Sequence, residues 1–287
     1  MNEGNEDLIW HYTNADAFLN IISNKELWAF DVECMNDHLE KKEFENTLQR
    51  CLAANGLLDN EEQVVRELIN KELIGAVCFS QAKDLLSQWI SYGDSGAGFS
   101  IGFSKQRLVR WLDDEYGFSS KLLDCIYDDD TKCKELNNLI ARVLGSYKHE
   151  VQIMGILERL GVSMQAEAKN TVFKNAGFKQ EQECRIVINM GKESNEFVSG
   201  NLPEDEGGEH FFRPTYDFMN RGGNITARRK LSFRDISLEE MVKQVVIGPK
   251  NPMPEDKVYE LVRHFSQKSD HHEETSIKVV KSLISLR

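Results

Sequence analysis

EQECRIV, residues 181–187, is the stretch whose pattern most strongly constrains the sheet of this protein and the side chains that the sheet presents. Glu181, Glu183 and Arg185 recur at a spacing of two, and successive side chains of a β-strand point to opposite faces. A strand that begins by Glu181 therefore places all three on one face and Cys184 on the other. Two carboxylates about 7 Å apart on one face repel each other unless a nearby group neutralises them. The stretch is either an ordinary exposed strand face, in which Arg185 pairs with Glu183, or one wall of a site that needs both carboxylates.

The remaining pattern of strands and helices predicts an α+β protein. Apolar runs bounded by turn residues predict strands at residues 8–12, 26–31, 74–80, 98–103, 183–190, 243–249 and 276–286, with a weaker strand pattern at 121–129. Apolar residues at helical spacing predict helices at 15–24, 59–73 and 254–267. From about 105 to 170 the pattern is mostly helical, and the polar residues 191–210 predict a loop. The simplest architecture is one domain over residues 1–287, with a helical insertion at about 105–170.

The predicted N-terminal strand ends in three side chains that can form hydrogen bonds. In LIWHYTN, residues 8–14, an apolar start runs into His11, Tyr12 and Thr13. Thr13 and Asp16 form a pair similar to a capping box, which predicts that Thr13 caps the following helix. Taken alone, His11 is most simply a partly buried histidine with one backbone hydrogen bond.

Composition narrows the class of protein. The net charge of −12 disfavours non-specific binding to nucleic-acid backbone, although it leaves room for a nucleic-acid substrate held in a local basic groove. The basic cluster Arg228-Arg229-Lys230 is most simply a solvated loop. No apolar run approaches the roughly 18 residues that span a bilayer, and the polar N-terminus does not resemble a secretory signal. We therefore expect a cytoplasmic protein without a membrane partner. The six cysteines form no CxxC pair, so neither a zinc site nor a disulfide framework is predicted.

Four polar clusters follow predicted strands, where a sheet usually presents its site. They are His11-Tyr12-Thr13, Asn36-Asp37, Ser80 with Trp89 and Tyr92, and Glu181 to Arg185. Trp89 and Tyr92 lie three residues apart on one helix face, a spacing more typical of core packing than of a ligand platform. Gly93, Gly96 and Gly98 then allow the backbone to come close to a ligand, but their spacing is not that of a phosphate loop. The GxSxG elbow of serine hydrolases is absent.

Taken in order, these pieces resemble a large, mostly uncharacterised bacterial family. Its pattern is HYT, a helix, an MND turn with a following Glu, CFS, WxxY ahead of a glycine-rich turn, and ExExR. The matching residues here are His11-Tyr12-Thr13, Met35-Asn36-Asp37 with Glu40, Cys78-Phe79-Ser80, Trp89 with Tyr92, and Glu181, Glu183 and Arg185. The later VVIGP, Val245 to Pro249, is similar to the closing strand of the family. The resemblance covers nearly the whole chain apart from the block at 105–170.

That family in turn resembles a branch of the ADP-ribosyltransferase superfamily. The similarity lies in an early strand ending in His, a middle strand with Ser or Tyr, and a late strand with Glu, often as ExE. The resemblance implies a split β-sheet core of the ADP-ribosyltransferase type, with NAD as a substrate. It also implies a toxin or an effector of defence against phage, which transfers ADP-ribose to a protein side chain or a nucleic-acid base. An antitoxin or other inhibitor protein would then be a further partner.

The resemblance gives the two glutamates catalytic roles. Glu183, which matches the second Glu of ExE, would stabilise the oxocarbenium-like charge that develops when the nicotinamide–ribose bond of NAD breaks. Glu181 would orient or deprotonate the acceptor. Arg185 would neutralise the glutamates or meet the pyrophosphate of NAD.

The other matched residues would line the NAD pocket. His11 would bond a ribose hydroxyl, the backbone of Tyr12 would hold the nicotinamide amide, and Thr13 would stand behind them. Tyr92 or Trp89 would stack on the nicotinamide ring, and Ser80 would support Glu183. This hypothesis makes a geometric prediction, because His11 and Glu183 must lie on adjacent strands and face one cleft.

Two other functions stay open. The first is a metal-dependent nuclease with Asp37, Glu181 and Glu183 as oxygen ligands of Mg²⁺, whose activity EDTA would abolish. The second is a catalytically silent fold, a binding or antitoxin-like module that retains the pocket. The helical block at 105–170 could be a lid, a partner interface or an inhibitor-binding surface.

Overall fold

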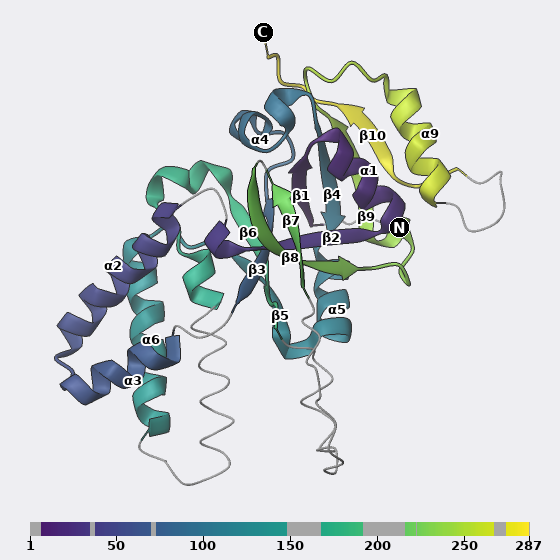
Figure 1. Cartoon of the computed structure of the whole chain (residues 1–287). Helices are drawn as coiled ribbons and strands as arrows, with labels where there is room; N and C mark the ends of the chain where they lie inside the picture. The colour runs from purple at the N-terminus through teal and green to yellow at the C-terminus, as the bar shows by residue number, and fades with distance from the viewer. Residues whose placement is uncertain are drawn as a thin grey trace, which may run out of the picture.

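The computed structural model shows a mixed α/β protein built on one mostly antiparallel, open sheet (Figure 1). It describes residues 7–34, 38–69, 73–147, 168–191, 216–221, 223–266 and 274–286. In these residues the strands are β1 (Leu8–Thr13), β2 (Glu26–Asp31), β3 (Ile74–Ser80), β4 (Phe99–Ser104), β5 (Ser120–Asp124), β6 (Glu183–Asn189), β7 (Asp217–Arg221), β8 (Asn224–Ser232), β9 (Val242–Ile247) and β10 (Lys278–Lys281). The pair β9–β10 is parallel, and the other pairs are antiparallel.

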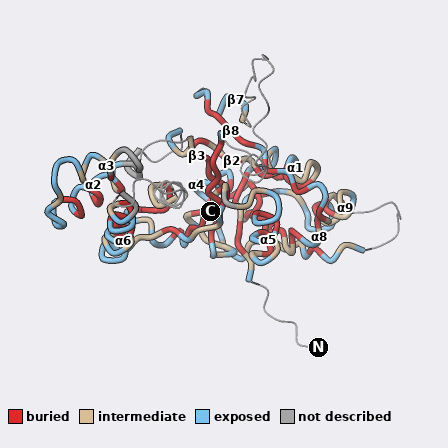
Figure 2. The backbone as a smooth tube through the Cα atoms, turned by 90° about the horizontal axis from the view of Figure 1, so that it is seen from below, coloured by how far each residue is buried: buried red, intermediate tan, exposed pale blue. Residues whose placement is uncertain are grey.

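Helices flank the sheet on both faces. They are α1 (Ala15–Asn24), α2 (His38–Asn55), α3 (Asp59–Ile69), α4 (Leu86–Ser91), α5 (Lys105–Tyr116), α6 (Asp129–Tyr147), α8 (Leu238–Met241) and α9 (Glu255–Ser266). One core lies between the sheet and α1, α5, α8 and α9, and a second lies between the other face and α2, α3 and α6. Figure 2 shows these two groups of helices at opposite ends of the molecule. Because both faces are covered, every residue of β4 and of β6 is buried.

The sheet divides at β3, and this division positions the site. Along the main path the strand order is β10-β9-β4-β1-β3-β2-β8-β7, while the other edge of β3 pairs with β6. β1 meets β3 only at Trp10, opposite Ser80, and β2 meets β3 only at Phe30 and Asp31. β1 and β2 therefore share one edge of β3 and diverge from each other, so side chains can enter the space between them.

The end of β1 packs closely on the glycine-rich turn. A Cβ atom on Gly98 would lie 2.1 Å from the carbonyl oxygen of Thr13, a distance that no side chain tolerates. This glycine is thus explained by the approach of two backbone segments. The helix cap was assigned to the wrong residue, because the Asn14 side chain, not that of Thr13, accepts the hydrogen bond from Ala17 N.

Several predicted elements differ from the structure. The block at 105–170 contributes α5, β5 and α6 and is not a purely helical insertion: the strand pattern predicted at 121–129 is present as β5, which pairs with β6 in the sheet. The hairpin of β7 and β8 was not predicted, and the basic cluster expected in a loop lies on β8. The last strand is shorter than residues 276–286. The predicted turn at Asn36-Asp37 and residues 192–210 of the predicted loop lie outside the described residues.

No helix in the described part of the chain is both long enough and apolar enough to cross a membrane.

Candidate functional site

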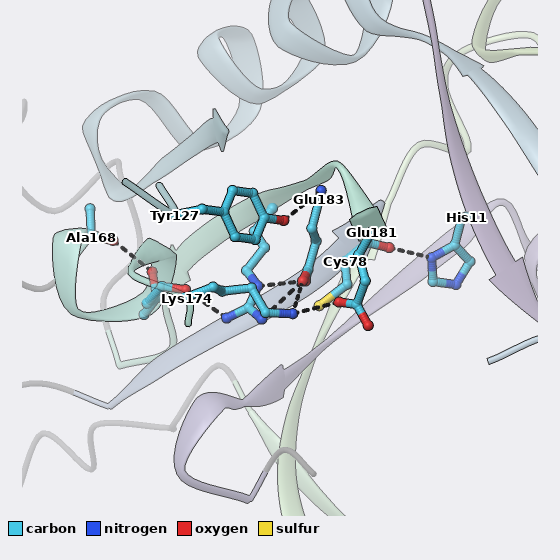
Figure 3. Close-up of polar contacts among 9 residues, drawn as sticks. His11, Cys78, Tyr127, Ala168, Lys174, Glu181 and Glu183 are labelled. Atoms are coloured by element: carbon cyan, nitrogen blue, oxygen red, sulfur yellow. Dashed lines mark hydrogen bonds and ion pairs between the residues drawn. The ribbon is translucent and has the colours of Figure 1, made fainter. Parts of the chain in front are cut away.

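Four charged side chains meet on the face of β6 that carries the ExExR pattern (Figure 3). The ammonium of Lys174 lies 2.7 Å from Oε2 of Glu181 and also bonds Oε2 of Glu183. Nε of Arg185 lies 2.6 Å from Oε1 of Glu183. Each of these side chains is at most 8% exposed. The cluster therefore contains two buried carboxylates and two buried cations, and its formal charge is zero.

A short 3₁₀ turn brings Glu181 to this cluster. The prediction that Glu181 belongs to the strand is wrong, because the turn Ala176–Glu181 ends there and β6 begins at Glu183. Between them Gln182 has a left-handed backbone with φ 48°, which turns the chain. The Glu181 carboxylate nevertheless reaches the same ammonium as that of Glu183. The predicted proximity of the two carboxylates is correct, but a turn rather than strand alternation produces it.

Ser80 and Tyr127 hold this turn and the start of β6. Ser80 lies directly opposite Glu183 in the β3–β6 ladder, and its hydroxyl donates to the backbone carbonyl of Glu181 at 2.7 Å. The backbone N–H of Glu183 donates to the Tyr127 hydroxyl at 3.0 Å. Arg185 also donates to the carbonyl of Thr171 at 2.6 Å. Ser80 was predicted to support Glu183; in the structure its hydroxyl holds the backbone of Glu181, and its own backbone lies opposite Glu183 in the ladder.

The charges in the cluster shift the pKa values of its members. Burial alone would raise the pKa of Glu183, but the charges of Arg185 and Lys174 and their hydrogen bonds lower it to about 2. Burial alone would lower the pKa of Lys174, but Glu183 and the hydrogen bonds to both glutamates raise it. Glu183 is therefore an anion at neutral pH. It can stabilise a developing positive charge but cannot act as a general acid.

The lowered pKa of Glu183 predicts a loss of stability in acid. The folded value of about 2 lies below the ordinary value of 4.5, so the contribution is complete above about pH 5 and disappears as the pH falls towards 2. The shift corresponds to a contribution on the order of 3 kcal/mol to the free energy of unfolding. Urea unfolding at pH 7, 5, 4 and 3 should show a steeper loss for the wild type than for Glu183→Gln. Parallel losses would contradict the assignment.

His11 lies where β1 and β3 separate. Its Nδ1 donates to the carbonyl oxygen of Cys78 at 2.9 Å, and its ring packs 5.6 Å from that of Phe79. Burial lowers the pKa of His11, the bond to Cys78 opposes this shift, and the charge of Arg221 adds to it. The imidazole is therefore neutral, with its proton on Nδ1 and an acceptor lone pair on Nε2. Figure 3 shows Cys78 between the imidazole and the two glutamates.

The predicted adjacency of the His11 and Glu183 strands is wrong. β3 lies between β1 and β6, and Ser80 on β3 is opposite both Trp10 and Glu183. Trp10, Ser80 and Glu183 therefore lie at one level of three consecutive strands. His11 is the next residue of β1, where side chains alternate between faces, and its ring packs against Phe79, so the register does not place it on the face of Glu183. The order of these strands was not recoverable from the sequence, because it depends on pairings between distant segments.

The two aromatic residues of the WxxY pattern have different environments. Trp89 is completely buried, packs edge-on against Tyr12 at 4.9 Å, and donates through Nε1 to Asp84 at 2.6 Å. It is a core residue. Tyr92 is 40% exposed, and burial followed by the charge of Glu181 raises the pKa of its hydroxyl. The structure thus places Tyr92, and not Trp89, beside the charged cluster.

The side chains of Tyr12 and Thr13 are used within the fold, so neither is available to bind a ligand. The Tyr12 hydroxyl donates to the carbonyl of Ala82 at 2.9 Å and accepts from the N–H of Leu85 at 3.0 Å. Thr13 is buried under Gly98. The backbone of Tyr12 remains the part of this residue that a ligand could use.

Lys174 and Tyr127 belong to the cluster and were missed in the sequence. Lys174 lies in no periodic pattern or recognisable motif, and Tyr127 lies in the weaker strand pattern at 121–129, which gave no indication of a site. One signal was present for Lys174, because two buried glutamates and a single arginine leave one negative charge without a partner, and such a charge requires another cation.

Comparison with known proteins gave one match. A model of the family described as a protein of unknown function (DUF2971) matches residues 88–186, about a third of the chain. The matched segment begins just before Trp89 and ends just after Arg185, so it includes the charged cluster but neither His11 nor Ser80. The searches of curated proteins and of solved structures found no match.

Proposed function

We propose that this protein is a mono-ADP-ribosyltransferase that cleaves NAD and transfers ADP-ribose to a protein or nucleic-acid acceptor. The observation that carries the proposal is the ionised Glu183 opposite Ser80 of β3, with His11 next to the point where β1 meets β3 and the sheet divides. A divided sheet with a histidine and a glutamate at the division is what the resemblance to ADP-ribosyltransferases implies. As a toxin or defence effector, such an enzyme would act inside a cell on a macromolecule.

The proposed reaction uses the permanent charge of Glu183. The bond between C1′ of the ribose and the nicotinamide nitrogen breaks, and its electron pair leaves with neutral nicotinamide. Positive charge then develops on the ribose, and an anion beside the 2′-hydroxyl stabilises it. Arg185 and Lys174 keep Glu183 ionised at neutral pH. Nε2 of His11 would accept a hydrogen bond from a ribose hydroxyl.

Glu181 would complete the transfer. The acceptor attacks C1′, the new bond forms there, and the acceptor's proton passes to the Glu181 carboxylate. Tyr92 would stack on the nicotinamide ring, because it is a partly exposed aromatic residue near enough to the cluster for the charge of Glu181 to act on its hydroxyl. Arg185 would neutralise the glutamates and not bind the pyrophosphate, since it already donates to Glu183 and to the carbonyl of Thr171.

The charged cluster disfavours the nuclease alternative. Both carboxylates are within hydrogen-bond distance of Lys174, and Glu183 also pairs with Arg185. A Mg²⁺ ion would have to displace these cations from the oxygens that it needs. Asp37, the third proposed ligand, lies outside the described residues.

One observation favours a binding module without turnover as the second candidate. All four charges of the cluster are buried and paired, as in a purely structural ion network. In that case the protein would bind its partner without consuming NAD.

An assay with labelled NAD distinguishes the transferase, the nuclease and the binding module. The purified protein is incubated with NAD labelled in the adenylate moiety, with cell protein or RNA as the acceptor, and with or without EDTA. The proposal predicts nicotinamide release and labelled polymer in both conditions. Degradation of the RNA that EDTA abolishes would point to the nuclease, while intact NAD together with unlabelled and undegraded polymers would leave the binding module.

Glu181→Gln tests the division of roles between the glutamates. We expect this variant to lose transfer to the acceptor by about 10²-fold or more, the effect of removing a general base. Its hydrolysis of NAD by water should fall less, because Glu183 retains both cations. The readout is the ratio of labelled polymer to released nicotinamide. An unchanged ratio would remove Glu181 from the acceptor step.

A further inference from the structure

The basic cluster Arg228-Arg229-Lys230 lies on a strand and is divided between two faces of the sheet. Arg229 is buried and donates to the carbonyl of Asn189 at 2.6 Å, so it belongs to the interior. Arg228 and Lys230 point to the other face, because neighbouring side chains on a strand alternate. On that face they meet β2, where Lys230 lies opposite Trp28 and Arg228 opposite Phe30.

Two guanidinium groups cover the aromatic rings of β2. The guanidinium carbon of Arg228 lies 4.0 Å from the centre of the Trp28 ring, and that of Arg221 lies 4.5 Å from the centre of the Phe30 ring. We call Trp28, Phe30, Arg221, Arg228 and Lys230 the arginine–aromatic strip. In Figure 1 its three strands, β2, β8 and β7, lie side by side at one edge of the sheet.

The strip is positively charged on a protein whose net charge is −12. Asp217 binds Arg228 with both oxygens, at 2.6 and 3.2 Å, and lies 3.5 Å from Lys230. Arg221 is exposed and has no ion pair with a carboxylate in the described part of the chain. One carboxylate therefore faces three cations, which leaves charge available for an anionic partner.

The strip is continuous with the candidate site. Phe30 lies opposite Ala76, and Ala76 points to the same face of β3 as Cys78 and Ser80. Two residues of a strand span about 7 Å, so the strip begins about 14 Å from Ser80. The charge of Arg221 also reaches His11, whose pKa it lowers. A chain bound along the strip would thus lead to the charged cluster.

We infer that the arginine–aromatic strip binds a single strand of nucleic acid and that the acceptor of the proposed transferase is a base of that strand. Arg221 and Lys230 would contact phosphates. Bases would stack on the outer faces of the guanidinium groups, which lie on the aromatic rings. An acidic peptide fits less well, because the fork of Arg228 is already occupied by Asp217 and is not free for a second carboxylate. The acceptor assignment rests on the proposed function, whereas the binding does not.

Binding is therefore measured without NAD. Fluorescence anisotropy with a labelled 12-nucleotide RNA, the matching DNA and an unlabelled poly-glutamate competitor is recorded between 50 and 300 mM salt. The test variant is Arg221→Gln with Lys230→Gln, which leaves the Arg228–Asp217 pair in place. The control is Arg110→Gln with Lys250→Gln, which removes the same charge from exposed positions outside the strip.

We expect the wild type to bind RNA, DNA or both, with an affinity that falls steeply with salt. The strip variant should bind at least about tenfold more weakly. The slope of its log K against log salt should be smaller in magnitude by about 1.4, which corresponds to the loss of two phosphate contacts on a single strand. The control should retain its affinity. Three results would overturn the inference. The wild type does not bind, both variants lose the same affinity, or poly-glutamate displaces the labelled strand as efficiently as unlabelled RNA does. If binding holds but NAD is not consumed, the strip stands and the proposed function fails.

Discussion

Glu183→Gln is expected to reduce nicotinamide release from NAD by about 10²–10³-fold, the usual effect of removing one preorganised electrostatic group from a transition state. Glutamine has the shape of glutamate but carries no charge, so the developing positive charge on the ribose would lose the anion that stabilises it. Arg185 and Lys174 would then lie close to that charge with only Glu181 to offset them. The remaining field would oppose the reaction, and the loss should appear mainly in kcat.

The control must separate lost chemistry from lost stability, because Glu183 is also part of a buried ion pair. Glu43→Gln provides it. Glu43 lies 2.5 Å from the completely buried ammonium of Lys132, between α2 and α6 and outside the candidate site. This variant should lose stability of a similar order but keep its rate of NAD cleavage while folded. Equal activity losses in the two variants, or full activity in Glu183→Gln, would show that Glu183 has no catalytic role.

The local pattern of the sequence predicted much of the site. The alternation in EQECRIV correctly placed Glu183 and Arg185 on one face, and their predicted pairing is confirmed at 2.6 Å. Lys174 was not found, because it reaches the cluster from a segment without periodicity. Local chemistry is visible in a sequence, whereas the partner that completes a buried charge cluster comes from another part of the fold.

Non-local pairing also explains the errors in the sheet. The insertion of β3 between β1 and β6 depends on three segments separated by more than 60 residues. The β8 segment, NITARRKLS, was missed because charged residues occupy positions that a strand usually gives to apolar ones. In the structure, Arg228 lies on the ring of Trp28, and Arg229 finds its partner in the carbonyl of Asn189. Long arginine side chains can thus take the place of apolar residues in a strand when they pack on aromatic rings or donate hydrogen bonds to carbonyls.

Lys174→Met is expected to lower the free energy of unfolding at pH 7 by about 3–5 kcal/mol, the usual cost of removing one partner from a buried ion pair. Methionine fills a similar volume, so the loss should come from charge rather than from a cavity. Glu181 would keep its carboxylate in a buried place without its cation, and Glu183 would retain Arg185 alone. Urea unfolding would measure the loss. Lys169→Met is the matched control, because Lys169 pairs with Glu135 at the surface and should contribute less than about 1 kcal/mol.

Two further measurements identify the charge as the cause. Because two carboxylates would then share one arginine, protonating one of them relieves the repulsion. The difference in the free energy of unfolding between the wild type and Lys174→Met should therefore be smaller at pH 5 than at pH 8. Adding Glu181→Gln to Lys174→Met leaves one carboxylate and one guanidinium, so the double variant should regain part of the lost stability. A deficit that is independent of pH and additive in the double variant would mean that Lys174 acts by packing. The two glutamates would then be stable as close neighbours without a cation between them, contrary to the electrostatics of the cluster.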